Sequence, residues 1–269
     1  MTVATAQPRI DVPSRVARAR DALASEWTKL RATRSTYWTL LIAASTGIGF
    51  SAVIAYAFAN PPPTSVGPPI DPLLPGFLSL EYAVLAVGVL GVLTVTAEHT
   101  TGLIRTTYTA TPHRRTVLAA KAAVVAGVTL IAGEAISFVS FLIDQAILSN
   151  HHHGVSLTVP GVPGAVAANG ILLCVCALLG VGLGAIIRHT AGTIATLTAL
   201  IVLPAAVGLL PAPWNDRVGR YTLVDAAQQV VAYHPRSALL TPGLSMLVLI
   251  TWPATVLAAA SLLITRQDT

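Results

Sequence analysis

Long runs without a charged residue constrain this chain more than any other feature of its sequence. The clearest runs from Trp38 to Phe58, where 21 consecutive residues carry no charged side chain. Because a helix rises about 1.5 Å per residue, such a run crosses the roughly 30 Å hydrocarbon core of a bilayer. Within lipid, only helices and closed barrels satisfy their own backbone hydrogen bonds. The run therefore predicts a membrane-spanning helix.

The rest of the chain extends this pattern into a single membrane domain. Hydrophobic residues make up 54% of the 269 residues and charged residues only 10%, whereas a soluble domain carries about 25% charged residues. We expect an all-α, polytopic membrane protein with a six-span transmembrane domain over 38–264, followed by a short cytoplasmic tail, 265–269. The predicted spans are 38–58, 77–97, 117–147, 165–187, 191–210 and 244–264.

The segment 1–37 is predicted to be a cytoplasmic tail that ends in an amphipathic helix. Its apolar residues recur at intervals of three and four, as one helical face requires: Val16, Ala19, Leu23, Trp27 and Leu30. Charged residues, including Glu26 and Lys29, occupy much of the remaining surface. We expect this helix to lie in the membrane interface with Trp27 at headgroup depth. An exposed cytoplasmic helix is the alternative.

The basic residues predict the orientation in the membrane. The net charge is +5, and seven of the 16 Lys and Arg residues precede position 35, which favours contact with anionic lipid over nucleic acid. Positive charge near the ends of spans biases a segment to stay inside. With both termini cytoplasmic, 13 of the 16 lie inside and three, Arg217, Arg220 and Arg236, lie in the last outer loop. An apolar stripe over 222–234 predicts a helix on, or dipping into, the outer leaflet.

The short motifs of the chain favour helix packing over catalysis or metal binding. No G-x-x-x-x-G-K-[ST] loop occurs, so this chain has no predicted phosphate cradle and any ATPase is expected on another chain. Gly180 and Gly184 have the G-x-x-x-G spacing that lets two helices approach closely in lipid. Cys174 and Cys176 are predicted to be packing residues, since a helix points them about 200° apart. His151–His153 lack nearby Cys or carboxylate partners apart from Asp144, so we expect no bound metal.

Isolated charges inside the predicted spans carry more information. Glu134 lies 13 residues past Lys121, about 20 Å along a helix and near mid-membrane. Burying a carboxylate there is costly unless it is protonated, paired or facing water. We expect Glu134 either to line a substrate or proton path or to be a protonated carboxyl bonded to a neighbouring helix. Glu81 and Asp144 fall near outer span ends, where we expect them to reach the interface.

The string EHTTGLIRTTYTATPHRRTVLAAK, from Glu98 to Lys121, resembles the first cytoplasmic loop of the type 2 ATP-binding-cassette (ABC) exporter permeases. In that family an acidic residue ends the second span, a Gly and an Arg follow, and a Pro and an Arg precede the third span. The matching residues are Glu98, Gly102, Arg105, Pro112, and Arg114 or Arg115. The string SEWTKLRATRSTYW, residues 25–38, is similar to the family's interfacial elbow helix.

The resemblance implies a non-enzymatic permease subunit of an exporter in the bacterial plasma membrane. It further implies a second permease copy, identical or related, and separate ABC ATPase subunits that carry ATP and Mg²⁺, so this chain binds no cofactor itself. Residues 98–115 would couple the ATPase to the spans during efflux. Two other functions remain open from the residues: a proton-coupled secondary transporter that uses Glu134, and a non-transporting membrane scaffold.

Overall fold

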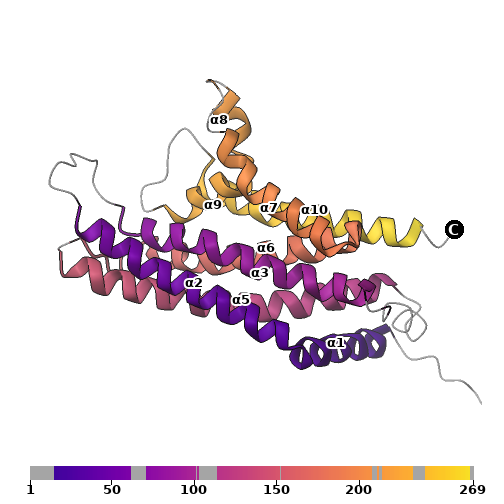
Figure 1. The fold of residues 1–269 in the computed structure, drawn as a ribbon. Helices are drawn as coiled ribbons and strands as arrows, with labels where there is room; N and C mark the ends of the chain where they lie inside the picture. The colour runs from indigo at the N-terminus through magenta and orange to yellow at the C-terminus, as the bar shows by residue number, and fades with distance from the viewer. Residues whose placement is uncertain are drawn as a thin grey trace, which may run out of the picture.

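The fold is all-α, and its long helices lie roughly side by side in one bundle (Figure 1). The computed structural model describes residues 15–61, 71–100, 102, 114–151, 153–207, 211, 214–232 and 240–266. These residues form nine helices and no strand. The prediction of an all-helical chain is confirmed.

Five helices are long and apolar enough to cross a membrane, which is the architecture of a multi-pass membrane protein. They are α2 (Arg34–Ala59), α3 (Leu74–Thr100), α5 (Arg114–Ser149), α6 (Val162–Ile187) and α10 (Pro242–Arg266). Each contains one of the predicted spans. The start of α5 differs from the prediction. Arg114 and Arg115 belong to its first turn, whereas they were predicted to lie in the polar segment before the span.

The remaining predicted span, 191–210, corresponds to a shorter element. Helix α7 (Thr190–Val207) has an apolar part that covers Thr190–Pro204, and residues 208–210 lie outside the described residues. The turn between α6 and α7 is as tight as predicted. Arg188 ends α6 in the left-handed conformation with φ +59, and α7 begins two residues later. Helix α7 then leaves the bundle at an angle (Figure 1).

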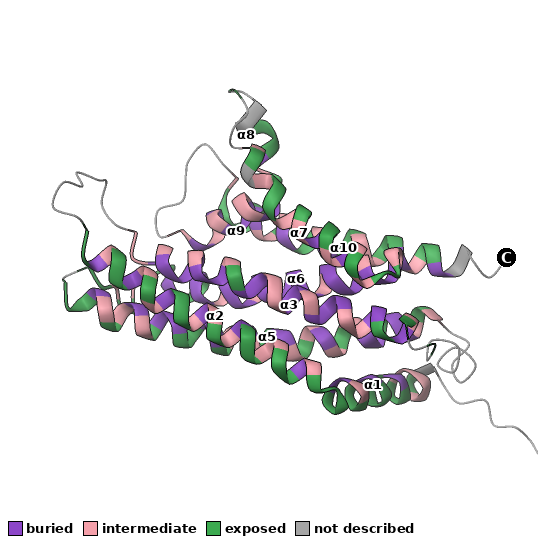
Figure 2. Cartoon of the chain, viewed as in Figure 1, coloured by how far each residue is buried: buried purple, intermediate pink, exposed green. Residues whose placement is uncertain are grey.

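The centre of the bundle is α6, which packs against α3, α5 and α10 and has many buried residues (purple in Figure 2). Glycine makes its contact with α3 possible. A Cβ on Gly91 of α3 would overlap with the carbonyl oxygen of Ala177, and one on Gly180 of α6 would overlap with that of Gly88. Gly184 also faces α3, beside Val95. The prediction that Gly180 and Gly184 serve close helix packing is confirmed.

The region between α7 and α10 contains two short helices, α8 (Trp214–Gly219) and α9 (Leu223–Val231). The predicted helix over 222–234 exists, and the Thr222 hydroxyl caps it by accepting a hydrogen bond from the backbone N–H of Asp225 at 3.2 Å. Its apolar face packs on α6 and α10, and Leu223, Ala226 and Ala227 are buried. The prediction placed this helix on, or dipping into, the outer leaflet, but its apolar face is covered by protein.

The N-terminal helix α1 (Arg15–Ala32) turns sharply into α2 and packs against α5 (Figure 1). Val16 and Trp27, on the predicted apolar face, are 78% and 50% exposed. The face that contacts the rest of the protein is formed by Ala22, Glu26 and Leu30, all buried. The sequence pattern thus predicted the helix but assigned Glu26 to the wrong side of it, because two charged residues are drawn inward by partners on other helices.

Candidate functional site

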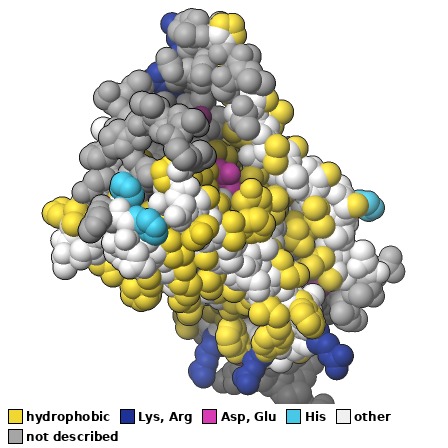
Figure 3. Space-filling model, turned by 60° about the vertical axis from the view of Figure 1, so that its left-hand side comes forward, with side chains coloured by type: hydrophobic (Ala, Val, Ile, Leu, Met, Phe, Trp, Pro, Cys, Tyr) yellow, Lys and Arg dark blue, Asp and Glu magenta, His cyan; other side chains and the backbone are white. Residues whose placement is uncertain are grey.

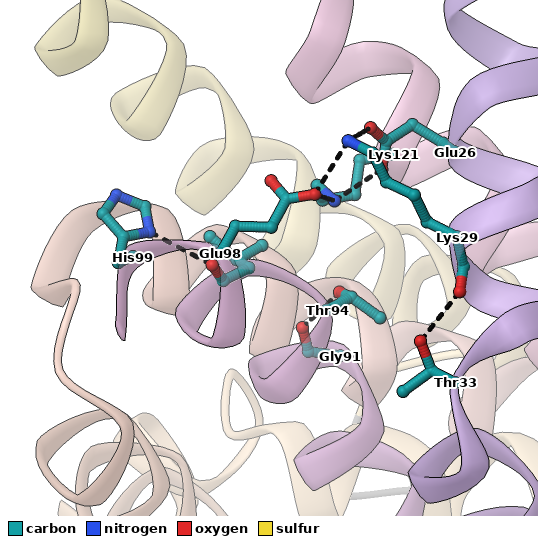
Figure 4. Close-up of polar contacts among 9 residues, drawn as sticks. Glu26, Lys29, Thr33, Gly91, Thr94, Glu98, His99 and Lys121 are labelled. Carbon is teal, nitrogen blue, oxygen red and sulfur yellow. Dashed lines mark hydrogen bonds and ion pairs between the residues drawn. The ribbon is translucent and has the colours of Figure 1, made fainter. Parts of the chain in front are cut away.

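A cluster of four charged side chains joins three helices at one end of the bundle. We call it the charge cluster: Glu26 and Lys29 of α1, Glu98 of α3 and Lys121 of α5 (Figure 4). Glu26 and Lys29 are three residues apart, so the helix brings them onto one face. Glu98 lies near the end of α3 and Lys121 two turns into α5, where the two helices adjoin.

Each ammonium group in the charge cluster bridges two carboxylates. Lys121 Nζ donates to Glu26 Oε2 at 2.5 Å and to Glu98 Oε1 at 3.1 Å. Lys29 Nζ donates to Glu26 Oε1 at 2.7 Å and to Glu98 Oε1 at 2.9 Å. The second oxygen of Glu98 points away from both lysines and has no hydrogen-bond partner within the part of the chain that the structure describes (Figure 4).

The members of the charge cluster differ in solvent exposure, and this difference decides how much each contributes to the stability of the fold. Glu26 is 5% exposed and the Lys121 side chain 8%, whereas 38% of the Lys29 side chain is exposed. Removing one partner of a buried pair leaves an uncompensated charge and costs about 3–5 kcal/mol, whereas an exposed pair contributes about 0–1 kcal/mol. We therefore expect the contact between Lys121 and Glu26 to dominate the stability of the charge cluster.

The charge of Lys29 is held in place by its neighbours. Burial alone lowers the pKa of a lysine, but the hydrogen bonds from Lys29 to Glu26 and Glu98, together with the negative charges of those carboxylates, outweigh this effect. The pKa of Lys29 is consequently raised above its ordinary value of 10.5. With two positive and two negative members, the charge cluster is neutral and acts as an electrostatic clamp between α1, α3 and α5.

The clamp flanks the segment that was predicted to couple to an ATPase. Glu98 is the first residue of this segment, 98–115, and Lys121 follows the segment within α5. Gly102 is exposed and has φ +72, a conformation that glycine adopts at little cost. Arg114 and Arg115 lie in the first turn of α5, while Arg105 and Pro112 lie outside the described residues. Of the predicted coupling residues, the structure therefore places Glu98 inside the clamp, and Gly102, Arg114 and Arg115 beside it.

Glu134, the predicted path residue, is distant from the charge cluster along α5. Its side chain is half-buried and packs over Gly170 of α6, where a Cβ would come within 2.5 Å of the Glu134 carboxyl carbon. Its carboxylate makes no hydrogen bond to another described residue. The predicted hydrogen bond to a neighbouring helix is therefore not found among the described residues. Gly170 is the residue that leaves room for this side chain between α5 and α6.

Asp144 departs from its prediction, because it is 2% exposed and does not reach the interface. Ser51 of α2, itself fully buried, donates a hydrogen bond from its hydroxyl to Asp144 Oδ1 at 2.6 Å. Close by, Gln145 accepts a hydrogen bond from the N–H of Val155 at 2.6 Å and donates one to the carbonyl of Pro72 at 3.1 Å. These polar contacts tie α5 to α2 and to the segments before α3 and α6.

The sequence did not predict that Glu26 and Lys29 belong to the site. A signal for them was present, since Glu98 and Lys121 stand at the ends of apolar helices and require partners of opposite charge. The sequence alone does not reveal that α1 supplies both partners, because 69 residues separate Lys29 from Glu98. Cys174 and Cys176 are free and buried, as predicted.

A pocket of about 520 Å³ lies against one side of the charge cluster. It is bounded by α1, the first turn of α2, α3 and α5. The four charged residues line one part of it, and aliphatic residues such as Leu90, Leu93 and Val125 line another. Among the described residues, no three His, Cys, Asp or Glu side chains are grouped so as to hold a metal ion.

A scan against models of known protein families finds no match to this sequence, and a search of curated proteins finds none either.

Proposed function

We propose that this chain is the membrane-spanning permease subunit of an ABC-type exporter, which forms the substrate path and is driven by a separate ATPase. The observation that carries the proposal is the clamp formed by Glu26, Lys29, Glu98 and Lys121. It bonds α1 to both helices that flank residues 101–113, the segment that resembles the coupling loop of these permeases.

A rigid junction at this position suits a coupling role. A force applied to the loop is delivered to the adjoining ends of α3 and α5, which the clamp holds together with α1. Rigid-body shifts of packed helices are a common way to transmit such a force, because a packed core switches between arrangements and does not deform continuously. The exposed Gly102 allows the chain to leave α3 sharply toward a docking partner.

The proposal assigns membrane roles to the shorter helices as well. Helix α1 is the interfacial elbow, with exposed Val16 and Trp27 toward lipid. Helix α7 is the fifth of six spans, since its 18 residues rise about 27 Å. Both termini lie on the cytoplasmic side of the bacterial plasma membrane. The face drawn in Figure 3 has a broad hydrophobic surface, with Lys and Arg side chains projecting below it and others at the opposite end of the molecule.

The proposed partners are those that the resemblance to these permeases implies. An ABC ATPase subunit binds ATP and Mg²⁺, and a second permease copy, identical or related, completes the path. Arg105, Pro112, Arg114 and Arg115 contact the ATPase, and the cation of Arg105 pairs with an acidic groove on it. The predominantly aliphatic helices suit an amphiphilic substrate that leaves the cell by alternating access.

Site-specific photo-crosslinking in the native host tests the coupling surface. A photoreactive residue placed at Tyr108, inside the proposed loop, is expected to crosslink a polypeptide with a Walker A motif, identified by mass spectrometry. The control places the same residue at Ser156, exposed in the connection between α5 and α6. Crosslinking of that polypeptide from Ser156 and not from Tyr108 would refute the proposed docking side.

Glu134 supports a second candidate, a proton-coupled secondary transporter. This carboxyl group lies within α5 and is partly accessible, so it can be reached by water for proton exchange, and no other described residue holds it in a hydrogen bond. Under this mechanism a pH gradient alone drives transport by the wild type, and Glu134→Gln abolishes transport. Under the exporter mechanism Glu134→Gln retains ATP-driven transport. A membrane scaffold would tolerate both Glu134→Gln and Arg105→Glu in any functional assay.

A further inference from the structure

The pocket beside the charge cluster has one polar and one apolar region. The apolar region is formed by aliphatic side chains from three helices, Leu30, Leu90, Leu93, Val124 and Val125. The polar region includes Lys29 and the first-turn residues Ser35 and Thr36 of α2. A volume of about 520 Å³ is comparable to that of pockets that bind small molecules. The shape and chemistry are therefore those of an amphiphile site.

Polar groups without partners indicate which end of the amphiphile binds there. Thr36 is 6% exposed, yet its hydroxyl makes no hydrogen bond to another described residue, and the same holds for the Ser35 hydroxyl. Lys29 uses two of its three N–H groups within the charge cluster. The first turn of α2 contains no acidic residue, and the Thr33 side chain does not cap it. These donors together favour an anionic oxygen group such as a phosphate.

The surroundings of the pocket indicate a lipid and not a soluble anion. Tyr37, Trp38 and Leu41 follow directly on α2 and are 57%, 63% and 54% exposed, so the pocket adjoins a surface suited to lipid. Because the charge cluster is neutral, the exposed Arg31 and Arg34 give the neighbourhood a positive charge. Such a surface attracts anionic headgroups in preference to zwitterionic ones.

We propose that this pocket binds one anionic phospholipid from the adjacent leaflet. The headgroup phosphate lies against Lys29, Ser35 and Thr36, and an acyl chain covers Leu90, Leu93 and Val124. The bound lipid wedges between α1 and α3 and supports the clamp from its open side. This inference goes beyond the proposed function and does not depend on it, because it requires only that the protein is embedded in a membrane.

The test measures lipid retention by native mass spectrometry and thermal stability of the purified full-length protein in mild detergent. Phosphatidylglycerol is expected to bind at one copy per chain and to raise the Tm, with phosphatidylcholine of the same acyl chains binding about tenfold more weakly. Leu93→Trp fills the pocket and is expected to abolish the retained lipid. The matched control is Ile131→Trp, at a position on α5 that is 75% exposed and does not line the pocket, which should keep the retained lipid.

A second variant tests the proposal even if Leu93→Trp fails to fold. Thr36→Val preserves the shape of the side chain and removes its hydroxyl, so it is expected to weaken phosphatidylglycerol binding about tenfold without lowering the Tm of the lipid-free protein. Equal retention of both lipids, or retention unchanged in Leu93→Trp, would overturn the proposal. So would equal stabilisation by glycerol phosphate alone, which would assign the site to a soluble anion. Loss of a dimer in Leu93→Trp, with no lipid bound to the parent protein, would assign the pocket to a protein interface and overturn it as well.

Discussion

Glu26 of α1 and Lys121 of α5 are 95 residues apart in the sequence, yet they form a buried ion pair in which 2.5 Å separates Oε2 from Nζ. This pair anchors an otherwise exposed amphipathic helix to the ends of the membrane helices. Lys29 and Glu98 complete the clamp.

Removal of the Lys121 ammonium should be the most damaging change to the clamp. Lys121→Met leaves Glu26 and Glu98 without their buried partner, and we expect a loss of about 3–5 kcal/mol of stability. Thermal unfolding in detergent measures the loss. Arg20→Met is the control, because Arg20 is exposed on α1, and it should change the Tm little. Equal effects of the two substitutions would contradict a structural role for the clamp.

Lys29 should contribute less than Lys121 and should lose its contribution only in alkali. Its folded-state pKa is raised above 10.5, so its stabilising effect is complete below the unfolded pKa and disappears as the pH rises through the folded value. The measurement is the Tm difference between the wild type and Lys29→Met from about pH 8 to about pH 12. We expect a constant difference up to about pH 10.5 that shrinks above it. A difference that shrinks already near neutral pH would disprove the assignment.

The contact between α3 and α6 should not tolerate a methyl group. Gly91→Ala places a Cβ against the backbone carbonyl of Ala177, which cannot rotate away, and we expect a loss of about 1–3 kcal/mol or failure to fold. Gly127→Ala on α5 is the control, since its Cβ meets open space and alanine favours a helix by about 1 kcal/mol. The comparison needs only the Tm and the yield of monodisperse protein. If Gly91→Ala were as stable as Gly127→Ala, the close approach of the two helices would be wrong.

The hydrogen bond from Ser51 to Asp144 should stabilise the opposite part of the bundle. Ser51→Ala leaves a buried carboxyl group without this donor, so we expect a loss of about 1–3 kcal/mol. Asp144→Asn should cost less, because the amide oxygen still accepts from Ser51. Ser45→Ala, exposed on the same helix, is the control for the serine change. Thermal unfolding that ranks Ser45→Ala as the most harmful of the three would exclude this role.

The sequence predicts the helical class and the positions of the five long apolar helices, because uncharged runs in lipid leave the backbone few alternatives. It also identifies Gly180 and Gly184 as packing residues from their spacing. It does not reveal the clamp, since Glu26 and Lys29 look like ordinary members of a polar helix face until α3 and α5 supply Glu98 and Lys121. For the same reason Asp144 was assigned to the interface: its partner Ser51 lies 93 residues away in the sequence, on another helix.

The most direct test of the proposed exporter is affinity purification of the tagged protein from its own host in gentle detergent, followed by mass spectrometry. We predict a stoichiometric partner that carries a Walker A motif, present with the wild type and lost with Arg105→Glu, while Arg20→Glu retains it. A folded, intact preparation that contains no such ATPase would contradict the exporter and shift the function to Glu134 and a proton-coupled mechanism.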